Sequence, residues 1–434
     1  MKIKTKRMNY EDVMALPMPK HQPPKKQRLF FRWLLKTVSA GSVKAVDFKC
    51  EDIGMEKLGK DDPALYLMNH SCFLDLSIAS VLLFPRQFHI VCTNDGFVGK
   101  NWLMNSIGCI PTKKFVTDVT LVKDMVYAVK KLHSSILMYP EASYSFDGTA
   151  TPLPETIGKL VKMLGVSVIM IKTYGAFHRD PLYNGLRLRK VKVNATREYL
   201  ISPEETKKLS AGEITETIRK QFIFDHFRWQ DEHHLKVDED FRATGLERVL
   251  YKCTNCGCEG TLLGEGITIR CTKCGETHEL TEYGQLARTG KSEDNHLTQK
   301  FKYVPDWYAW QRECVKEEIL SGQYHQEIPV RIMILKDTKA VYEVGTGTLI
   351  HDAGGFKLEG CNGKIHYTQT PECSYSIYAD YFWYEIGDVI CIGDTKMQYY
   401  CFPVTETAIV AKARLAAEEL FKIVSDNRRE KVTT

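Results

Sequence analysis

The chain has 434 residues, of which 44% are hydrophobic and 26% charged, and this is the composition of a globular protein. The length exceeds what one hydrophobic core supports, so we expect roughly two to four domains. No apolar run reaches the ~18 residues of a membrane-spanning helix, and the N-terminus lacks the apolar core of a secretory signal. Fourteen cysteines in such a chain indicate reduced thiols and a cytoplasmic protein.

The net charge of +5 is concentrated near the N-terminus. Residues 1–50 hold twelve Lys and Arg against three Asp and Glu. Residues 1–28 are basic and rich in proline, and we expect them to be poorly ordered. Arg28, Arg32 and Lys36 then form one cationic stripe on an otherwise aromatic and aliphatic helix. Two interpretations stay open: a helix lying in a membrane interface, or a helix packed on the domain core with a charged outer edge.

Residues 43–225 alternate between strand-like and helix-like runs. The alternation predicts an α/β sandwich with a mostly parallel sheet, in which loops at the carboxyl ends of the strands form the binding crevice. The strand-like runs are residues 43–48, 64–68, 87–93, 107–111, 135–139, 166–172 and 186–195. The helix-like runs are residues 73–84, 99–106, 118–132, 155–164 and 203–224.

One turn, directly after the run 64–68, organises this region. Asn69 and His70 belong to a segment that favours turns and helix N-caps, so His70 should lie between a strand and a helix, with Asp75 in the helix's first turn. Because each residue turns a helix by roughly 100°, two residues five apart on an unbroken helix would diverge. A histidine in the preceding turn can instead fold back onto the carboxylate, which holds one ring nitrogen and leaves the other as a base.

Four segments together resemble the motifs of the glycerolipid acyltransferases, the family of 1-acyl-glycerol-3-phosphate acyltransferases. The first is Asn69-His70-x4-Asp75, and the others follow in order at residues 108–114, 139–145 and 165–171. The resemblance covers roughly residues 30–225. It implies an O-acyltransferase of phospholipid biosynthesis, which moves a fatty acyl group from a thioester to the hydroxyl of a lysophospholipid such as 1-acyl-glycerol-3-phosphate. The donor would be acyl-ACP or acyl-CoA.

The resemblance also implies roles for individual residues. His70 would act as general base on the acceptor hydroxyl, and Asp75 would orient it. The substrate-binding positions of the motifs would be Asn69, Lys113, Lys114, Glu141, Ala142 and Ser143. The chain departs from the family where phosphate is bound. The two lysines stand in place of the second motif's arginine, which loses its bidentate fork, and Tyr144 replaces the third motif's arginine.

These departures keep two alternatives open. One is a membrane-associated scaffold with an inactive acyltransferase fold, which Tyr144 favours and the retention of His70, Asp75 and Glu141 opposes. The other is acyl transfer to an acceptor other than lysophosphatidate, including an amine or a non-lipid hydroxyl. A soluble acceptor would not need the basic N-terminal helix. We therefore expect a peripheral protein on the inner face of the membrane.

Two cysteine pairs have the spacing of a zinc ribbon. They lie fourteen residues apart, and each is followed by a glycine that permits the tight turn below a metal. A closed four-thiolate site has no open coordination position, so we expect structural zinc and no catalytic cofactor. Cys258 is a spare thiol. The segment is not basic enough for a nucleic-acid partner. The predicted ligands are Cys253, Cys256, Cys271 and Cys274.

Two segments flank the ribbon. Residues 226–250 are charged and helical in part, and we interpret their histidines as solvated surface rather than as a metal site. Residues 285–303 have the composition of a linker. A helix then runs to about Leu320, with Asp306 as its N-cap and with Trp307 and Trp310 on one face, docked on the ribbon or on the last domain.

From residue 329 to 404 the pattern changes to short strands separated by Gly and Asp turns, and a helix from about residue 406 to 424 closes it. By arrangement this region resembles a pleckstrin-homology-like all-β barrel. Its six basic and nine acidic residues argue against phosphoinositide binding, so we favour an interaction or packing module. The predicted domains are a basic N-terminal segment and interfacial helix (1–42), an acyltransferase domain (43–235), a zinc ribbon (236–285), a linker and aromatic helix (286–328) and a pleckstrin-homology-like β domain (329–428).

Overall fold

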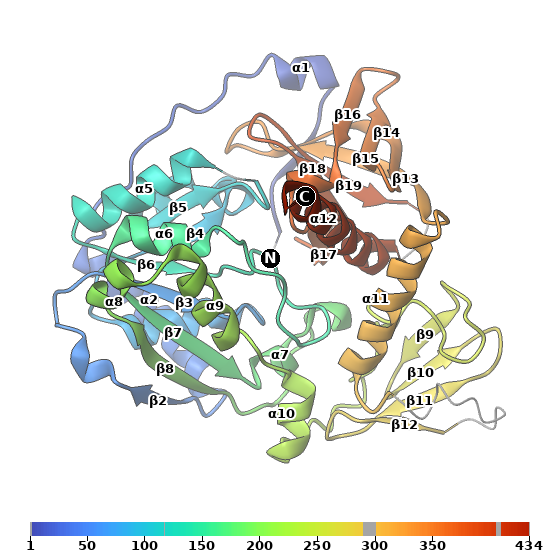
Figure 1. Ribbon diagram of the computed structural model, residues 1–434, viewed down its shortest axis with the longest axis horizontal. Helices are drawn as coiled ribbons and strands as arrows, with labels where there is room; N and C mark the ends of the chain where they lie inside the picture. The colour runs from blue at the N-terminus through green and yellow to red at the C-terminus, as the bar shows by residue number, and fades with distance from the viewer. Residues whose placement is uncertain (1, 117, 290–300, 405–408, 434) are drawn as a thin grey trace.

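The computed structural model describes residues 2–116, 118–289, 301–404 and 409–433. Figure 1 shows two bodies side by side, an N-terminal α/β domain and a C-terminal region rich in strands, with a small four-stranded sheet below the latter. The predicted mixed α/β architecture with a mostly-β C-terminal region is confirmed. Within the described part of the chain, no helix combines the length and apolarity that crossing a membrane would need.

The N-terminal domain is built on a seven-stranded sheet with the order β2-β8-β7-β3-β6-β4-β5. Every neighbouring pair is parallel except β7 and β8, as the sequence pattern predicts. The strands are β2 (Lys49–Ile53), β3 (Ala64–Met68), β4 (Phe88–Thr93), β5 (Cys109–Thr112), β6 (Ser135–Met138), β7 (Ser167–Tyr174) and β8 (Asn194–Ile201).

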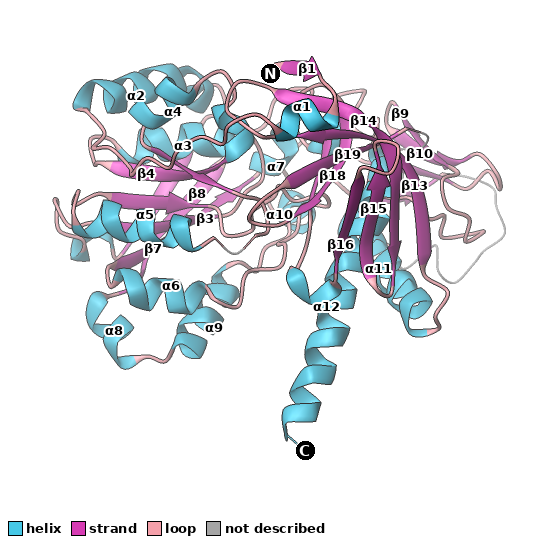
Figure 2. Cartoon of the chain, turned by 90° about the horizontal axis from the view of Figure 1, so that it is seen from above, coloured by secondary structure: helices cyan, strands magenta, loops and turns pink. Residues whose placement is uncertain are grey.

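Helices cover both faces of this sheet, and β3 shows why (Figure 2). Its five residues are all buried, and they alternate between two cores. Tyr66 and Met68 pack with α2 and α3, whereas Leu65 and Leu67 pack with α5, α6 and α9. The helices of this domain are α2 (Leu29–Lys44), α3 (Leu74–Leu83), α4 (Asn101–Ser106), α5 (Val119–Lys130), α6 (Ile157–Leu164), α7 (Ala176–Arg179), α8 (Pro203–Lys208), α9 (Ala211–Gln221) and α10 (His226–Glu232).

Three expectations for this domain are wrong in detail. The run 43–48 is not a strand, because the apolar stripe of α2 continues through Val43 and the chain becomes extended only at β2. The run 186–195 is mostly loop, and the strand is β8. The run 203–224 is two helices, because Ser202 and Ser210 each form a complete capping box and so begin separate helices.

The basic N-terminal segment is packed rather than poorly ordered. Its strand β1 (Thr5–Arg7) pairs in parallel with β14 of the C-terminal region, and helix α1 (Tyr10–Met14) buries Val13 completely. The segment then returns to the N-terminal domain, where buried Gln27 donates a hydrogen bond to the backbone carbonyl of Ile107 at 2.8 Å. Residues 2–28 therefore link the two bodies of the molecule.

The four-stranded sheet, in the order β12-β11-β10-β9, carries the cysteine pairs. Its strands are β9 (Leu262–Glu265), β10 (Thr268–Cys271), β11 (Thr277–Leu280) and β12 (Leu286–Arg288), and β12 lies in the segment expected to be a linker. Helix α11 (Val304–Leu320) docks on it, since the ring centroid of Trp307 is 5.3 Å from that of His278 in β11. Tyr303 is the N-cap, and Asp306 is the third helical residue, which accepts from the Tyr303 backbone N–H.

The C-terminal sheet follows the path β16-β15-β14-β13-β19-β18-β17, with β1 added beside β14. No pairing within the described residues joins β16 to β17, so the sheet is open and the expected closed barrel is not found. Helix α12 (Ile409–Thr433) follows it; the expected helix start at residue 406 lies outside the described residues. The strands are β13 (His325–Ile334), β14 (Val341–Asp352), β15 (Gly355–Gly360), β16 (Ile365–Gln369), β17 (Tyr378–Trp383), β18 (Gly387–Gly393) and β19 (Gln398–Pro403).

Candidate active site

His70 lies in the loop that joins β3 to α3, and Asp75 lies in the first turn of α3, as the sequence predicts. The Nδ1 atom of His70 is 3.1 Å from Oδ2 of Asp75. The same oxygen accepts the backbone N–H groups of Ser71 at 2.7 Å and Cys72 at 3.0 Å. Because Oδ2 acts as an acceptor, Nδ1 carries the proton in this pair and Nε2 keeps its lone pair.

Two tyrosine rings hold the imidazole of His70. Its centroid is 4.2 Å from that of Tyr139 and 4.0 Å from that of Tyr144, with interplanar angles of 25° and 31°. Two rings cannot share one face of an imidazole at these distances, so they cover opposite faces. Tyr144 also touches Phe73, 5.4 Å between centroids. The residue that replaces the third motif's arginine therefore packs directly on the expected base.

Two of the predicted substrate-binding residues, Asn69 and Glu141, are buried and anchor the loop that carries His70. Asn69 is fully buried; its amide nitrogen donates to the carbonyl of Thr173 at 3.1 Å, and its oxygen accepts the Thr173 backbone N–H at 2.8 Å. Glu141 is equally buried and accepts from the His70 backbone N–H at 2.9 Å and from Thr151. Burial raises the pKa of Glu141 to about 7. Neither side chain lines the cavity at His70, and direct substrate contact stays a prediction for both.

A cavity of about 160 Å³ opens at His70. Among the predicted substrate-binding residues, Lys114, Ala142 and Ser143 line it. Lys113 does not; its ammonium donates to the backbone oxygen of Thr395 in the C-terminal region. Lys114 is buried and ion-paired with Asp95, 3.1 Å between Nζ and Oδ2.

The far wall of the cavity comes from the C-terminal sheet, which sequence reasoning assigned to packing or interaction. Seven of the eight residues from 378 to 385, in β17 and the turn after it, line the cavity with His70. Trp383 donates from its indole nitrogen to Asp95 at 3.2 Å, and the ring of Tyr381 stacks on that of Phe146 at 4.5 Å. No motif connects positions about 300 residues apart, so nothing in the sequence pointed to this wall.

Behind the loop lies a buried histidine that the sequence reading missed. His226 begins α10 and is 1% exposed, contrary to the expectation of a solvated surface. Its Nε2 is 3.0 Å from Oγ of Ser71, and its backbone oxygen accepts from Nε2 of His178 at 2.9 Å. Burial lowers the pKa of both histidines, that of His178 to about 3. His233 and His234 are exposed as expected.

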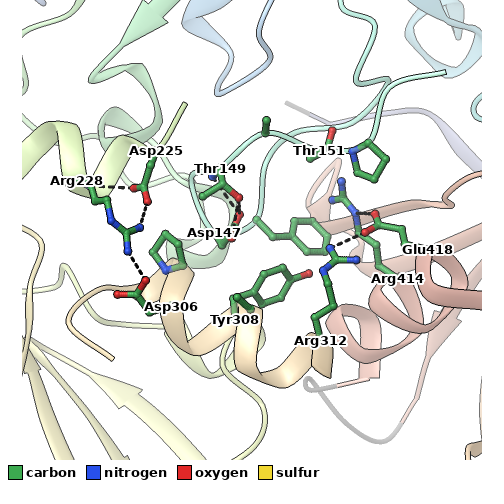
Figure 3. Close-up of a pocket in the computed structure, with 15 residues that line it drawn as sticks. Asp147, Thr149, Thr151, Asp225, Arg228, Asp306, Tyr308, Arg312, Arg414 and Glu418 are labelled. Atoms are coloured by element: carbon green, nitrogen blue, oxygen red, sulfur yellow. Dashed lines mark hydrogen bonds and ion pairs between the residues drawn. The ribbon is translucent and has the colours of Figure 1, made fainter. Parts of the chain in front are cut away.

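A second cavity, of about 320 Å³, lies between the loop after β6, α11 and α12 (Figure 3). Its three arginines are all paired: Arg228 with Asp225 and Asp306, and both Arg312 and Arg414 with Glu418. Burial alone would raise the pKa of Glu418, but the two arginines outweigh it and lower that pKa. These pairs neutralise the cavity's cations.

This arginine network reaches the active-site loop. Nη1 of Arg414 donates to the backbone oxygen of Tyr144 at 3.2 Å, and its guanidinium lies 4.5 Å from the Phe146 ring centroid. Helix α12 therefore supports the loop that presents Tyr144 to His70.

The four predicted cysteine ligands lie together in the small sheet, with their sulfur atoms within 4.8 Å of one another. The Sγ atoms of Cys253 and Cys274 are 3.7 Å apart, and those of Cys256 and Cys271 are 3.8 Å apart. A tetrahedral site with Zn–S bonds of ~2.3 Å has S–S edges of about 3.8 Å, so the donor set fits zinc. Cys258 stands outside the cluster, 2.8 Å from the Lys273 ammonium.

Comparison with known proteins matches residues 49–172 to the acyltransferase family. Over 133 residues the chain is 29% identical to the chloroplastic 1-acyl-sn-glycerol-3-phosphate acyltransferase BAT2 of Brassica napus and to the chloroplastic LPAT1 of Arabidopsis thaliana. Each match covers 30% of this chain, and it spans 38% and 36% of the two relatives. Among solved structures, the acyltransferase PlsC of Thermotoga maritima aligns with a TM-score of 0.36 and 16% identity, over 44% of this chain and 76% of PlsC.

Proposed function

We propose that the protein is an O-acyltransferase that esterifies the hydroxyl of a lysophospholipid, and the match of residues 49–172 to the acyltransferase family supports this proposal. The observation that carries the proposal is the pair of His70 and Asp75, joined at 3.1 Å in a loop that opens on a cavity. The named relatives act on 1-acyl-sn-glycerol-3-phosphate, which makes lysophosphatidate the first acceptor to test. The acyl donor would be acyl-ACP or acyl-CoA.

The chemistry needs one base. Nε2 of His70 takes the proton of the acceptor hydroxyl while the hydroxyl oxygen attacks the thioester carbonyl carbon. The C–S bond breaks, an ester forms, and the proton passes from His70 to the departing thiolate. Asp75 holds Nδ1–H and stabilises the imidazolium that forms between these steps. A thioester is already activated, so no covalent enzyme intermediate is required, and burial raises the pKa of the nearby Cys72 thiol well above its usual value.

The test is acyl transfer from labelled acyl-ACP and acyl-CoA to a panel of lysolipids by the wild type, His70→Ala and His325→Ala. His325 is an exposed histidine at the start of β13 and serves as the matched control. We expect transfer by the wild type and the control and none by His70→Ala. If the wild type is silent with every donor and acceptor, the scaffold alternative replaces the proposal.

We propose that the four cysteines hold one structural zinc ion. Each of the four supplies one thiolate, which closes the coordination sphere and leaves no position for a substrate. The ion would join the segment before β9 to the end of β10, and α11 contacts the first of these through the hydrogen bond from Trp307 to Lys252. The ion would contribute to folding and not to acyl transfer.

We also propose that the protein works as a peripheral protein on the inner face of the membrane. Helix α2 packs on the domain through Phe31 and leaves Phe30 61% and Trp33 52% exposed. Trp102 of α4 is 73% exposed, and its ring is 5.9 Å from that of Phe31. This group of aromatic side chains suits insertion at a bilayer interface.

The cations of α2 do not all point outward, as the predicted cationic stripe would require. Arg32 donates to the backbone oxygen of Pro85 at 2.6 Å, and the Lys36 ammonium lies 4.4 Å from the Phe84 ring centroid. Two of the three cations therefore face the domain, and the membrane proposal rests on the aromatic side chains.

A further inference from the structure

The cavity at His70 holds little positive charge. Among its described lining residues Lys114 is the one Lys or Arg, and the same lining contains Asp95, Asp380 and Glu385. Glu385, at the rim, pairs with Lys2 at 4.0 Å. The two aspartates are 3% and 7% exposed, so solvent screens their charges little. A phosphomonoester placed here would meet more negative than positive charge.

The single cation is already engaged. Nζ of Lys114 lies 3.1 Å from Oδ2 of Asp95 and 3.1 Å from the centroid of the Tyr378 ring. Its neighbour Lys113 is turned away toward Thr395. Neither lysine of the second motif presents a free ammonium to a phosphate, and Tyr144 occupies the position of the third motif's arginine.

The unsatisfied polar atoms of the cavity are acceptors. Oδ1 of Asp380 and Oδ1 of Asp95 are both buried and make no hydrogen bond among the described residues. The other oxygen of Asp380 accepts from the Tyr378 hydroxyl at 2.5 Å. Burial raises the pKa of Asp380 to about 6, although Tyr378 and Lys114 oppose the shift. A buried carboxylate oxygen without a donor is costly, and an N–H group of a ligand that reached it would remove that cost.

Aromatic rings complete the same wall. Trp383 and Tyr384 line the cavity beside Asp380, and Tyr144 lines it beside His70. The negative faces of such rings attract cations and do not attract anions. The charge of the wall and its unpaired acceptor thus favour a cation, and its aromatic rings are compatible with one.

Building on the acyl transfer proposed above, we infer that the acceptor carries a primary ammonium group, which Asp380 binds while His70 activates the acceptor's hydroxyl. A primary ammonium offers N–H donors to the unpartnered oxygen of Asp380, whereas a trimethylammonium offers none. Asp380, in the C-terminal sheet, is then the residue that sets acceptor specificity.

The experiment compares acceptors with one acyl chain and five head groups: lysophosphatidylethanolamine, lysophosphatidylcholine, lysophosphatidate, monoacylglycerol and a long-chain amino alcohol without phosphate. The last separates a free amino alcohol from a phospholipid head as the source of the ammonium. We expect kcat/KM for the primary ammonium acceptors to exceed that for lysophosphatidate and lysophosphatidylcholine by about tenfold or more. Only the primary ammonium can donate charge-assisted hydrogen bonds to the carboxylate, and the other two head groups leave those bonds unmade.

Three variants test whether the acceptor preference depends on the charge of Asp380. Asp380→Asn should remove the preference by lowering kcat/KM about tenfold more for the ammonium acceptors than for monoacylglycerol, because only the charge is lost. Asp380→Glu should restore part of the preference. Glu359→Gln, an exposed carboxylate of β15, should change nothing. Isothermal titration of a short-chain, soluble lysophosphatidylethanolamine into wild type and Asp380→Asn gives the same comparison without turnover.

The outcomes separate the two proposals. A wild type that prefers lysophosphatidate, with a ranking that Asp380→Asn leaves intact, overturns the ammonium inference and keeps the acyl transfer. Binding of the soluble ammonium lysolipid that depends on Asp380, in a protein that transfers to no acceptor, supports the ammonium site and overturns the acyl transfer. Equal binding by wild type and Asp380→Asn overturns the inference, whatever the activity.

Discussion

The phenol ring of Tyr144 lies 4.0 Å from the imidazole of His70, at the position where the related motif carries an arginine. An aromatic contact has replaced a charge. It orients the base between two rings, since Tyr139 covers the other face. A stacked pair of this kind contributes about 1 kcal/mol beyond the area that it buries.

We therefore expect Tyr144→Ala to lower kcat by about fivefold, which corresponds to about 1 kcal/mol, because the imidazole loses one of its two supports. Tyr144→Phe keeps the ring and should stay within about twofold of the wild type. Steady-state kinetics that separate kcat from KM check this. If Tyr144→Phe and Tyr144→Ala lose the same activity, the hydroxyl and not the stack is what matters.

Removal of metal should destabilise the small sheet and what docks on it. We expect about one zinc ion per chain in the purified protein, and we expect chelation to lower the melting temperature, because the binding energy of a structural zinc is folding energy. Replacing both Cys253 and Cys256 by Ser should mimic chelation. Cys258→Ser is the control, since Cys258 stands outside the cluster. A protein without zinc, or one whose melting is indifferent to the cysteine pair, would refute the site.

Membrane association should depend on the exposed rings of α2. We expect the combined change Phe30→Ser and Trp33→Ser to weaken partitioning onto anionic vesicles by roughly 10- to 100-fold, because the exposed half of each ring contributes about 1 kcal/mol when it leaves water. Point changes are preferable to deleting the N-terminus, because residues 5–7 and Gln27 are part of the fold. Leu188→Ser, at a 64% exposed leucine outside α2 and α4, is the control. Unchanged flotation of the α2 variant contradicts the proposal.

Acid should weaken the C-terminal sheet through His351, which stacks on Phe356 with centroids 3.6 Å apart. Burial lowers the pKa of His351 to about 3. Between that value and the usual value near 6.5, the unfolded chain binds the proton and the folded one does not, so stability falls as the pH falls. From pH 7 to 5 the loss is about 2 kcal/mol.

His351→Phe removes that titration and keeps a ring at the position. The Tyr324 hydroxyl loses its contact with His351 but still donates to Gln326 at 2.8 Å. Urea unfolding of both proteins at pH 7 and pH 5 should show the variant gaining about 2 kcal/mol relative to the wild type at the lower pH. The comparison between two proteins cancels the other groups that titrate. A difference that is the same at both pH values would contradict the buried neutral histidine.

The sequence was informative where chemistry is local in the chain. The placement of His70 and Asp75 around one turn, the central strand β3 and the cysteine pairs all follow from residues within about twenty positions of each other. The sequence also contains a signal for the split between α8 and α9, because Ser202 and Ser210 are each followed three residues later by glutamate. The prediction of one helix over 203–224 overlooked this signal in favour of the longer helical pattern.

The rest of the site depends on tertiary structure that no local pattern encodes. Lys114 was expected to bind phosphate. Its ammonium is instead ion-paired with Asp95 and lies over the ring of Tyr378, two residues from other parts of the chain. Asp380 lies in a region that looked like a packing module and instead closes the cavity. His226 looked like surface because its neighbours are polar, yet it is buried against Ser71.

The central claim is that His70 is the base for acyl transfer, and His70→Gln tests it most directly. Glutamine has a similar reach and cannot take the proton, so substrate binding is kept while catalysis is lost. With the best acceptor of the panel, the account predicts a kcat lower by about 10²- to 10⁴-fold, with KM within about threefold. A His70→Gln enzyme that retains kcat within about tenfold of the wild type would contradict it.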